Sequence, residues 1–299
     1  MKKIIAITGP TASGKTALAI KLAQALNTEI ISADSRQFYR EMSIGTAVPE
    51  PEELAAAKHH FIQHISIHQA YNVGDYEQDF LRLSKELFQK HDIIILVGGS
   101  GLYIDAACKG LDNLPPRNES IRTELEKKLA EKGIDVLQAE LQKLDPEHYE
   151  KIDKKNPHRL IRAIEILRQS GGKKMSELLQ NKPQRDFECI YLGLNTERAK
   201  LYKRINKRVD IMMQKGLLDE ARKLYPYRDL QALQTVGYRE LFSYFDGDIV
   251  LDLAVSEIKK NTRRFAKRQL TWFRKNKEIR WFDIDYDLEE ILSYLQDLP

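Results

Sequence analysis

A loop near the start of the chain constrains its fold more than any other stretch. Residues 9–16 read GPTASGKT, which is glycine, four residues, glycine, lysine and threonine. An apolar run over 2–8 predicts a strand before the loop, and alanines and leucines at helical spacing over 17–26 predict a helix after it. In such a unit, backbone N–H groups and the positive end of the helix bind phosphate oxygens. The sequence therefore predicts an α/β fold, a parallel sheet flanked by helices, built around a phosphate-binding loop.

The side chains of this loop indicate how a phosphate compound would be held. Lys15 would bridge the outer phosphates, and the Thr16 hydroxyl would hold a Mg²⁺ ion. The phosphate contacts are expected from Gly9, Thr11, Ala12, Ser13, Gly14, Lys15 and Thr16. A tight glycine-rich turn without phosphate is the alternative. The loop does not distinguish a diphosphate from a nucleoside triphosphate such as ATP, so the compound itself is left open.

Composition places the chain among ordinary globular proteins. Of its 299 residues, 42% are apolar and 31% are charged, which excludes disordered and fibrous classes and allows one large domain or two smaller ones. Cys108 and Cys189 stand in no metal or redox spacing, as expected in a reducing compartment. No apolar run is long enough to span a membrane and no cleavable signal precedes the first strand. We therefore expect a soluble, cytoplasmic protein.

Asp34 directly follows a predicted strand at 29–33. Ligands of open α/β sheets bind at the carboxyl ends of strands, so Asp34 is expected where a second substrate could meet the phosphate loop. Its carboxylate could take a proton from a nucleophile, order a Mg²⁺-bound water, or cap the next helix. The residues alone leave these three interpretations open.

A continuous apolar run at 93–97 predicts a strand buried on both faces, and it ends in the glycine-rich segment 98–103. Many phosphate-loop hydrolases place an acidic Mg²⁺ ligand at such a strand end, whereas this chain has glycines and Ser100. The pattern disfavours a motor or switch ATPase. Glycines allow a ligand to approach the backbone closely, and a bare strand-to-helix turn is the alternative.

The composition changes at Leu114, and only helical patterns follow up to residue 181. They predict helices at 121–132, 134–144, 146–152, 157–169 and 174–179. Strand character resumes at 188–194. We therefore predict a phosphate-loop core at 1–114 and 187–299, interrupted by an all-helical insertion domain at 115–186. Such an insert could close over the phosphate site as a flap and exclude water.

Basic residues cluster in the second part of the core. Arg198, Arg204 and Arg208 share a predicted helix, either as a solvated face or as a lid over a leaving phosphate group. Between 257 and 277, nine Lys or Arg stand against one Glu, with aromatic residues interleaved. This pattern favours RNA binding through phosphates and stacked bases, with a plain amphipathic helix as the alternative. Four histidines between 59 and 68 lack the spacing of a metal site.

Eight stretches, taken together and in order, resemble the tRNA dimethylallyltransferases of the bacterial type, also called tRNA isopentenyltransferases. The resemblance covers nearly the whole chain. The stretches are 9–16, 32–35 with Gln37 and 39–40, 45–47, 59–60, 98–103, 156–159, 237–238, and 262–263 with 266–269 and 271–273.

The resemblance implies transfer of a dimethylallyl group from dimethylallyl diphosphate to N6 of the adenine 3′ of the tRNA anticodon. The phosphate loop would then hold the diphosphate of the prenyl donor, with Mg²⁺ as cofactor. The implied partners are the anticodon stem-loop of tRNA and the prenyl donor, and we expect the chain to act as a monomer.

The resemblance also implies roles for individual residues. Asp34 would accept the N6 proton, Ser100 would lie near the reacting centre, and Lys15 and Thr16 would stabilise the leaving diphosphate. Arg204 and Arg208 would join the loop in binding the diphosphate. Contacts with tRNA are implied for Asp34, Ser35, Arg36, Gln37, Ser100, Arg122, His158, Arg159, Arg162, Arg263, Lys267 and Arg268.

The sequence departs from the family pattern at a few positions. Ser100 stands where the family usually has Thr, Val48 where a basic residue is common, and Gln63 where Asp is frequent. Arg36 and Phe38 replace an apolar pair. A kinase, which would consume ATP, and an RNA-binding protein with a vestigial phosphate loop are the rival classes.

Overall fold

The computed structural model describes residues 2–179 and 182–297 and separates into two compact units. The first unit comprises Met1–Cys108 and Arg185–Pro299, and the second comprises Lys109–Gln184. The sequence-based insert, 115–186, begins six residues later than the second unit. The last residue of this connecting segment, Leu114, packs against the apolar core of the helices.

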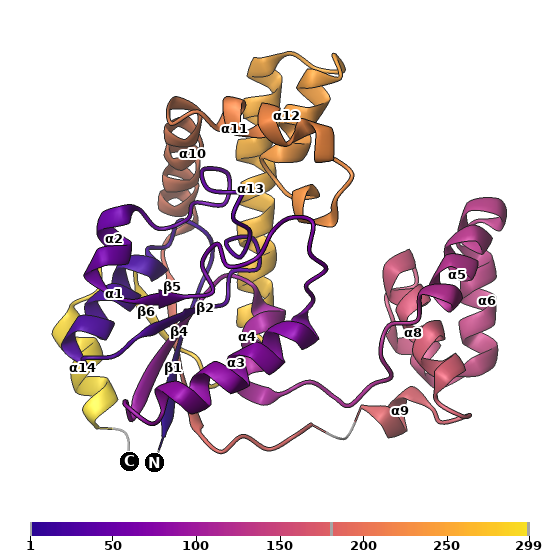
Figure 1. The fold of residues 1–299 in the computed structure, drawn as a ribbon, viewed down its shortest axis with the longest axis horizontal. Coiled ribbons are helices and arrows are strands. Elements are labelled where there is room, and N and C mark those ends of the chain that lie inside the picture. The colour runs from indigo at the N-terminus through magenta and orange to yellow at the C-terminus, as the bar shows by residue number, and fades with distance from the viewer. Residues whose placement is uncertain (1, 180–181, 298–299) are drawn as a thin grey trace. The chain divides into compact units, whose positions relative to one another are not determined.

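The first unit is built on one parallel sheet with strand order β3-β2-β4-β1-β5-β6 (Figure 1). The strands are β1 (Lys3–Thr8), β2 (Ile30–Ser32), β3 (His59–His60), β4 (Ile93–Val97), β5 (Glu188–Asn195) and β6 (Arg280–Asp283). Strands β4 and β5, which precede and follow the second unit in the sequence, pair with opposite edges of β1. The second unit is therefore inserted into a single sheet, and the predicted parallel α/β fold is confirmed.

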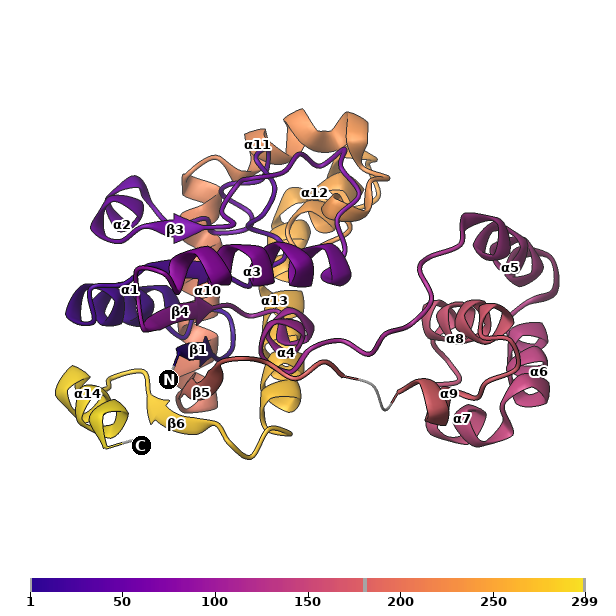
Figure 2. The ribbon, with the colours of Figure 1, turned by 60° about the horizontal axis from the view of Figure 1, so that its bottom comes forward.

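Helices cover both faces of the sheet (Figure 2). Side chains alternate along each strand, so Ile4 packs with Tyr76 and Phe80 on one face, and Ile5 packs with Leu18 on the other. The helices are α1 (Lys15–Ala25), α2 (Pro51–Ala56), α3 (Val73–Leu87), α4 (Gly101–Lys109), α10 (Arg198–Gln214), α11 (Leu217–Leu224), α12 (Tyr238–Phe245), α13 (Leu251–Phe273) and α14 (Leu288–Gln296), with 3₁₀ turns at Tyr225–Tyr227 and Gln231–Leu233. Within the described ranges, we find no helix with the length and apolar character needed to cross a membrane.

The two cysteines are neighbours in space, although they lie far apart in the sequence. The Cys189 thiol donates to Cys108 O at 3.8 Å, and both thiols are free. Burial raises the pKa of the Cys108 thiol well above its ordinary value. The thiol therefore stays protonated and unreactive.

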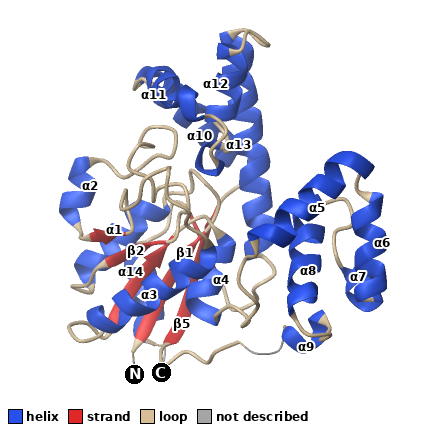
Figure 3. Cartoon of the chain, turned by 45° about the vertical axis from the view of Figure 1, so that its right-hand side comes forward, coloured by secondary structure: helices blue, strands red, loops and turns tan. Residues whose placement is uncertain are grey.

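In its described residues the second unit is entirely helical (Figure 3). Its helices are α5 (Glu119–Lys132), α6 (Asp135–Leu144), α7 (Pro146–Lys151), α8 (Pro157–Gln169) and α9 (Met175–Leu178). Asn118 and Asn156 cap α5 and α8 by accepting bonds from backbone N–H groups of their first turns. Leu125, Leu141 and Leu160 are completely buried in the core between the helices.

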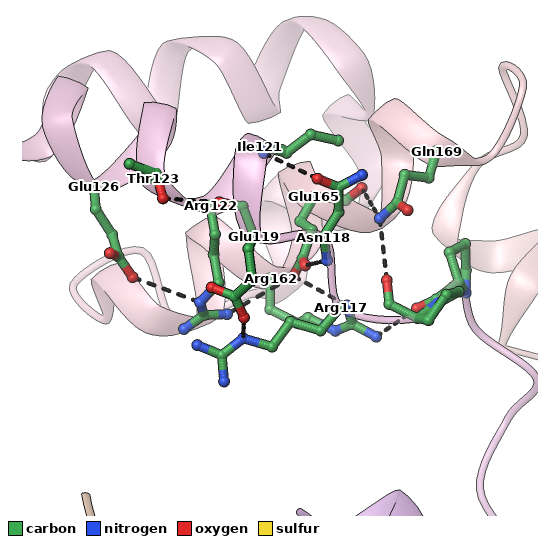
Figure 4. A network of polar contacts seen from close by, with 12 residues as sticks. Arg117, Asn118, Glu119, Ile121, Arg122, Thr123, Glu126, Arg162, Glu165 and Gln169 are labelled. Atoms are coloured by element: carbon green, nitrogen blue, oxygen red, sulfur yellow. Dashed lines mark hydrogen bonds and ion pairs between the residues drawn. The ribbon is translucent and has the colours of Figure 1, made fainter. Parts of the chain in front are cut away.

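A buried carboxylate joins three parts of this unit (Figure 4). Glu165 on α8 is fully buried. It accepts from Asn118 N at 2.6 Å and from Arg162 Nη1 at 3.0 Å, and its distance to Arg122 Nη1 is 3.8 Å. This buried carboxylate therefore holds both the largely buried Arg122 and the partly exposed Arg162.

Loss of this carboxylate is expected to destabilise the second unit. Glu165→Ala leaves a buried N–H without an acceptor and two guanidinium groups without their shared counter-charge, so the free energy of unfolding of the unit should fall by about 3 kcal/mol. Hydrogen exchange of α8 peptides would report the change. Both tryptophans, Trp272 and Trp281, lie in the first unit, whose fluorescence transition should not move.

Glu126→Ala provides the control, because the Glu126 carboxylate is 54% exposed where it pairs with Arg122 Nε at 3.5 Å. An ion pair with a solvent-exposed carboxylate contributes about 0.5 kcal/mol. Equal exchange rates in the two variants would show that the buried network does not stabilise the unit.

Candidate active site

The carboxyl ends of three neighbouring strands open into one cavity of the first unit. The cavity has a volume of about 510 Å³. The phosphate loop follows β1, Asp34 follows β2 and Ser100 follows β4, and parallel pairing places these strand ends side by side. Of the sequence-predicted residues, the structure brings to the cavity Thr11, Lys15, Thr16, Asp34, Ser35, Arg36, Gln37, Ser100, Arg208 and Arg268.

The phosphate loop is held by residues of α10 and by its own lysine. Arg204 Nε donates to Ala12 O at 2.8 Å, and Arg208 Nη1 donates to Thr11 Oγ1 at 3.4 Å. Lys15 Nζ donates to Pro10 O at 2.7 Å. Arg204 thus supports the loop from outside the cavity lining, whereas Arg208 and Lys15 reach the lining itself.

The electrostatics of the cavity favour an anion. Burial lowers the pKa of Lys15 to about 8, an effect that Asp34 opposes and Arg208 reinforces. Burial likewise lowers the pKa of Arg208, which keeps its charge at neutral pH. The two cations lie near Asp34, and Arg208 also feels Glu53, in a place where water screens charges poorly. An anionic ligand would relieve the repulsion between the two cations.

Asp34 begins a turn and not a helix. Gln37 N donates to Asp34 O at 3.0 Å, and Arg36 N donates to Asp34 Oδ1 at 3.1 Å. The next helix, α2, starts at Pro51, so the interpretation of Asp34 as a helix cap is wrong. Its carboxylate remains at the cavity, beside the phosphate loop.

Ser100 is tied to Ser35, the residue after Asp34. Ser100 Oγ accepts from Ser35 N at 3.1 Å and lies 3.0 Å from Ser35 Oγ. The turns that follow β2 and β4 are therefore joined by hydrogen bonds at the cavity. The segment after β4 is more than a bare strand-to-helix turn.

Arg36 and Gln37 line the cavity, but their polar ends are engaged by backbone oxygens. Gln37 Nε2 donates to Ala47 O at 2.8 Å, and Arg36 Nη1 donates to Ala232 O at 3.0 Å. In this structure they position the neighbouring loops.

Glu220 of α11 holds a loop that lines the cavity, and the sequence analysis missed it. Its carboxylate accepts from the backbone N–H groups of Ser43, Ile44 and Gly45, at 3.0, 2.8 and 2.9 Å. Tyr238 OH donates to the same carboxylate at 2.7 Å. Two stretches of the sequence pattern, 45–47 and 237–238, therefore both bind the Glu220 carboxylate. In the sequence, Glu220 is one charged residue among several on an amphipathic helix, and nothing local marks it.

The remaining predicted tRNA contacts lie in several places. On α13, Lys267 and Arg268 are exposed, and Arg263 Nη1 donates to Asn206 Oδ1 at 2.7 Å. Phe265 and Trp272, each 38% exposed, line the cavity on the same helix. In the second unit, Arg122 and Arg162 belong to the Glu165 network, whereas His158 and Arg159 are exposed in the first turn of α8.

The lowered pKa of Lys15 predicts pH-dependent binding of inorganic diphosphate. Lys15 loses its charge as the pH rises through about 8, so affinity should fall about tenfold per pH unit above that value. Calorimetric titrations from pH 7 to 9.5 would measure it. In Lys15→Arg the charge persists, so the ratio of the two affinities should change with pH. A constant ratio would remove Lys15 from the anion site.

Comparison with known proteins identifies the family. The family model described as IPP transferase matches residues 37–276. The tRNA dimethylallyltransferase of Christiangramia forsetii is 58% identical over 98% of this chain and 97% of its own length, and that of Flavobacterium johnsoniae is 54% identical over 99% and 97%.

Solved structures agree with this assignment. The tRNA isopentenylpyrophosphate transferase of Bacillus halodurans has a TM-score of 0.74 and 39% identity, covering 99% of this chain and 96% of its own. A eukaryotic dimethylallyltransferase acting on tRNA has a TM-score of 0.83 and 26% identity, covering 100% and 81%. The chain belongs to the IPP transferase family, that of the tRNA dimethylallyltransferases.

Proposed function

We infer that this protein transfers a dimethylallyl group from dimethylallyl diphosphate to N6 of the adenine 3′ of the anticodon in tRNA, releasing diphosphate. Family membership supports the reaction class. The observation that carries the assignment of roles is the meeting of a cationic phosphate loop with Asp34 and Ser100 in one cavity. This transfer requires a site that stabilises the leaving diphosphate and a group that accepts the proton from N6.

On the donor side, we assign the diphosphate to the phosphate loop. Lys15 and Arg208 would neutralise the charge that develops on the leaving diphosphate. Arg204 keeps the loop in shape through its bond to Ala12 O. An ATP-dependent kinase would use the same loop, so the donor must be identified by experiment.

Mg²⁺ fits the donor atoms of this site. The Thr16 hydroxyl lines the cavity, and oxygen is the ligand atom that Mg²⁺ prefers. No group of three or more metal-ligating side chains occurs in the described part of the chain, so phosphate oxygens and water would complete the shell. Bound there, Mg²⁺ would supply additional positive charge to the leaving group.

On the acceptor side, we assign Asp34 as the base. The N6 lone pair attacks C1 of the dimethylallyl group, the bond from C1 to the diphosphate oxygen breaks with its electron pair, and Asp34 takes the N6 proton. The hydroxyls of Ser35 and Ser100 are 3.0 Å apart at this place and can hold the amine in position. The target base would have to leave the loop stack to enter the cavity, which costs less in a single-stranded loop than in a duplex.

Water must be kept from the partly ionised prenyl group. Apolar side chains in the cavity lining suit this purpose, among them Leu102, Met212, Ile258 and Trp272. Closure of the helical unit over the site stays a prediction. We propose that the protein acts as a monomer, and that it works in the cytoplasm, as its tRNA substrate suggests.

Mass spectrometry of an unmodified anticodon stem-loop RNA would test this function. The RNA is incubated with the protein, Mg²⁺ and either dimethylallyl diphosphate or ATP. We expect a five-carbon mass gain on the adenine 3′ of the anticodon with the prenyl donor alone. Phosphate transfer or hydrolysis of ATP, without any gain in RNA mass, would favour a kinase instead.

The role of Asp34 can be separated from binding. Asp34→Asn should lower the single-turnover rate by about 10² to 10⁴ with RNA affinity little changed, because the amide cannot accept the proton. Asp219→Asn removes the same charge from an exposed position on α11 and serves as the matched control. Near-normal chemistry in the Asp34 variant would refute the assignment.

A further inference from the structure

Gln269 lies almost completely buried in α13, 6% exposed, and its side-chain amide connects two loops of the cavity. Its Oε1 accepts from Thr11 N in the phosphate loop at 2.8 Å. Its Nε2 donates to Gly99 O, after β4, at 2.9 Å. Thr11 offers a donor and Gly99 an acceptor, so these partners fix the orientation of the amide.

The turn after β4, which carries Gly98 and Gly99, lies close to both Gln269 and Asp34. A Cβ on Gly99 would lie 2.3 Å from Gln269 Nε2 and 3.8 Å from Asp34 Oδ2, so both side chains lie close to the open face of Gly99. A Cβ on Gly98 would lie 2.4 Å from Ala33 O, so the two backbones touch directly. A displacement of the turn at Gly99 would therefore reach Asp34 through close contacts.

The same turn carries Ser100, and α13 is fixed beside it. Trp272 Nε1, three residues after Gln269, donates to Asp105 Oδ2 on α4 at 2.8 Å. This contact anchors the helix that carries Gln269 to the helix that follows Ser100. The Gln269 amide thus joins the phosphate loop to the turn after β4, and the contact between Trp272 and Asp105 fixes the helix that carries it.

Glutamine suits this position because it has one donor and one acceptor at the end of a single planar group. A residue with only one of the two would leave either the Thr11 N–H or the Gly99 carbonyl without its partner. The loops concerned carry the groups to which we assigned the leaving diphosphate and the attacking amine.

We propose that Gln269 is a positioning residue for the prenyl transfer, which sets the separation between the phosphate loop and the turn bearing Ser100 and Asp34. This inference rests on the proposed function. Gln269 lines the cavity and acts through the bonds that its amide makes with Thr11 and Gly99. A shift of about 1 Å between reacting groups can reduce a rate about 10²-fold, so a residue in this place affects chemistry more than binding.

Gln269→Met removes both hydrogen bonds and keeps the side-chain length. We expect its single-turnover rate at saturating donor and RNA to fall about 10²-fold, with the dissociation constants of both substrates changed by less than about threefold. Thr271→Ala is the control on the same helix, since Thr271 is exposed and bonds only to Lys267 O in its own helix at 3.0 Å. A normal rate in Gln269→Met, or a loss confined to substrate affinity, would overturn the proposal.

Gln269→Glu adds a readout that simple loss of stability would not produce. Its protonated carboxyl carries one donor and one acceptor, as the amide does, whereas its ionised form has no donor for Gly99 O. The rate of this variant relative to the native protein should therefore rise as the pH falls. Gln269→Met should show a constant ratio over the same range.

Hydrogen exchange of peptides covering 97–104, without substrates, distinguishes failure of this inference from failure of the proposed function. We expect faster exchange in Gln269→Met than in the native protein and in Thr271→Ala. Unchanged exchange would refute the positioning role even if the prenyl transfer is found. Absence of transfer by the native protein would refute the proposed function whatever the exchange shows.

Discussion

The pairing of β1 with β4, and of β4 with β2, all parallel, is the constraint on which the site depends. Parallel strands end at the same edge of a sheet, so the segments after these three strands must meet there. The phosphate loop, Asp34 and Ser100 are those segments. Insertion of the helical unit between β4 and β5 leaves the edge intact, because both strands still pair with β1.

At the same edge of the sheet, burial disfavours the charged forms of two basic side chains. Lys15 and Arg208 are held where burial lowers the pKa of each, with Asp34 as the nearby carboxylate that favours their charged forms. Burial of these two cations is an electrostatic strain that binding of an anion would relieve. In the proposed reaction the most negative species is the leaving diphosphate. The two cations would therefore stabilise it and favour the transfer.

Two side chains from distant parts of the chain, the half-buried Glu220 and the buried Gln269, give the loops their positions. Glu220 gathers three N–H groups of 43–45, and Gln269 joins the phosphate loop to the turn after β4. Loops on a sheet edge lack the repeating hydrogen bonds of a strand. A single side chain that satisfies several of their backbone groups therefore decides where they lie.

The sequence by itself determined the phosphate loop, the buried strands, the helical insertion and the parallel α/β class. Each of these is a local pattern, read within about ten to twenty neighbouring residues from glycine placement and apolar periodicity. It also placed Asp34 and Ser100 at strand ends. Local pattern left the role of Asp34 open between catalysis and capping, because capping depends on whether a helix follows, and the next helix begins only at Pro51.

Tertiary structure alone decided which polar side chains form hydrogen bonds and ion pairs with distant parts of the chain. Gln269 and Thr11 are 258 positions apart, and Glu220 and Gly45 are 175 apart, so no local pattern records either contact. Arg122 and Arg162 look in the sequence like free basic residues, yet the fold places them around the buried Glu165. The reason is physical: a buried polar group takes its partner from whichever segment the packing brings near, and packing is a property of the whole chain.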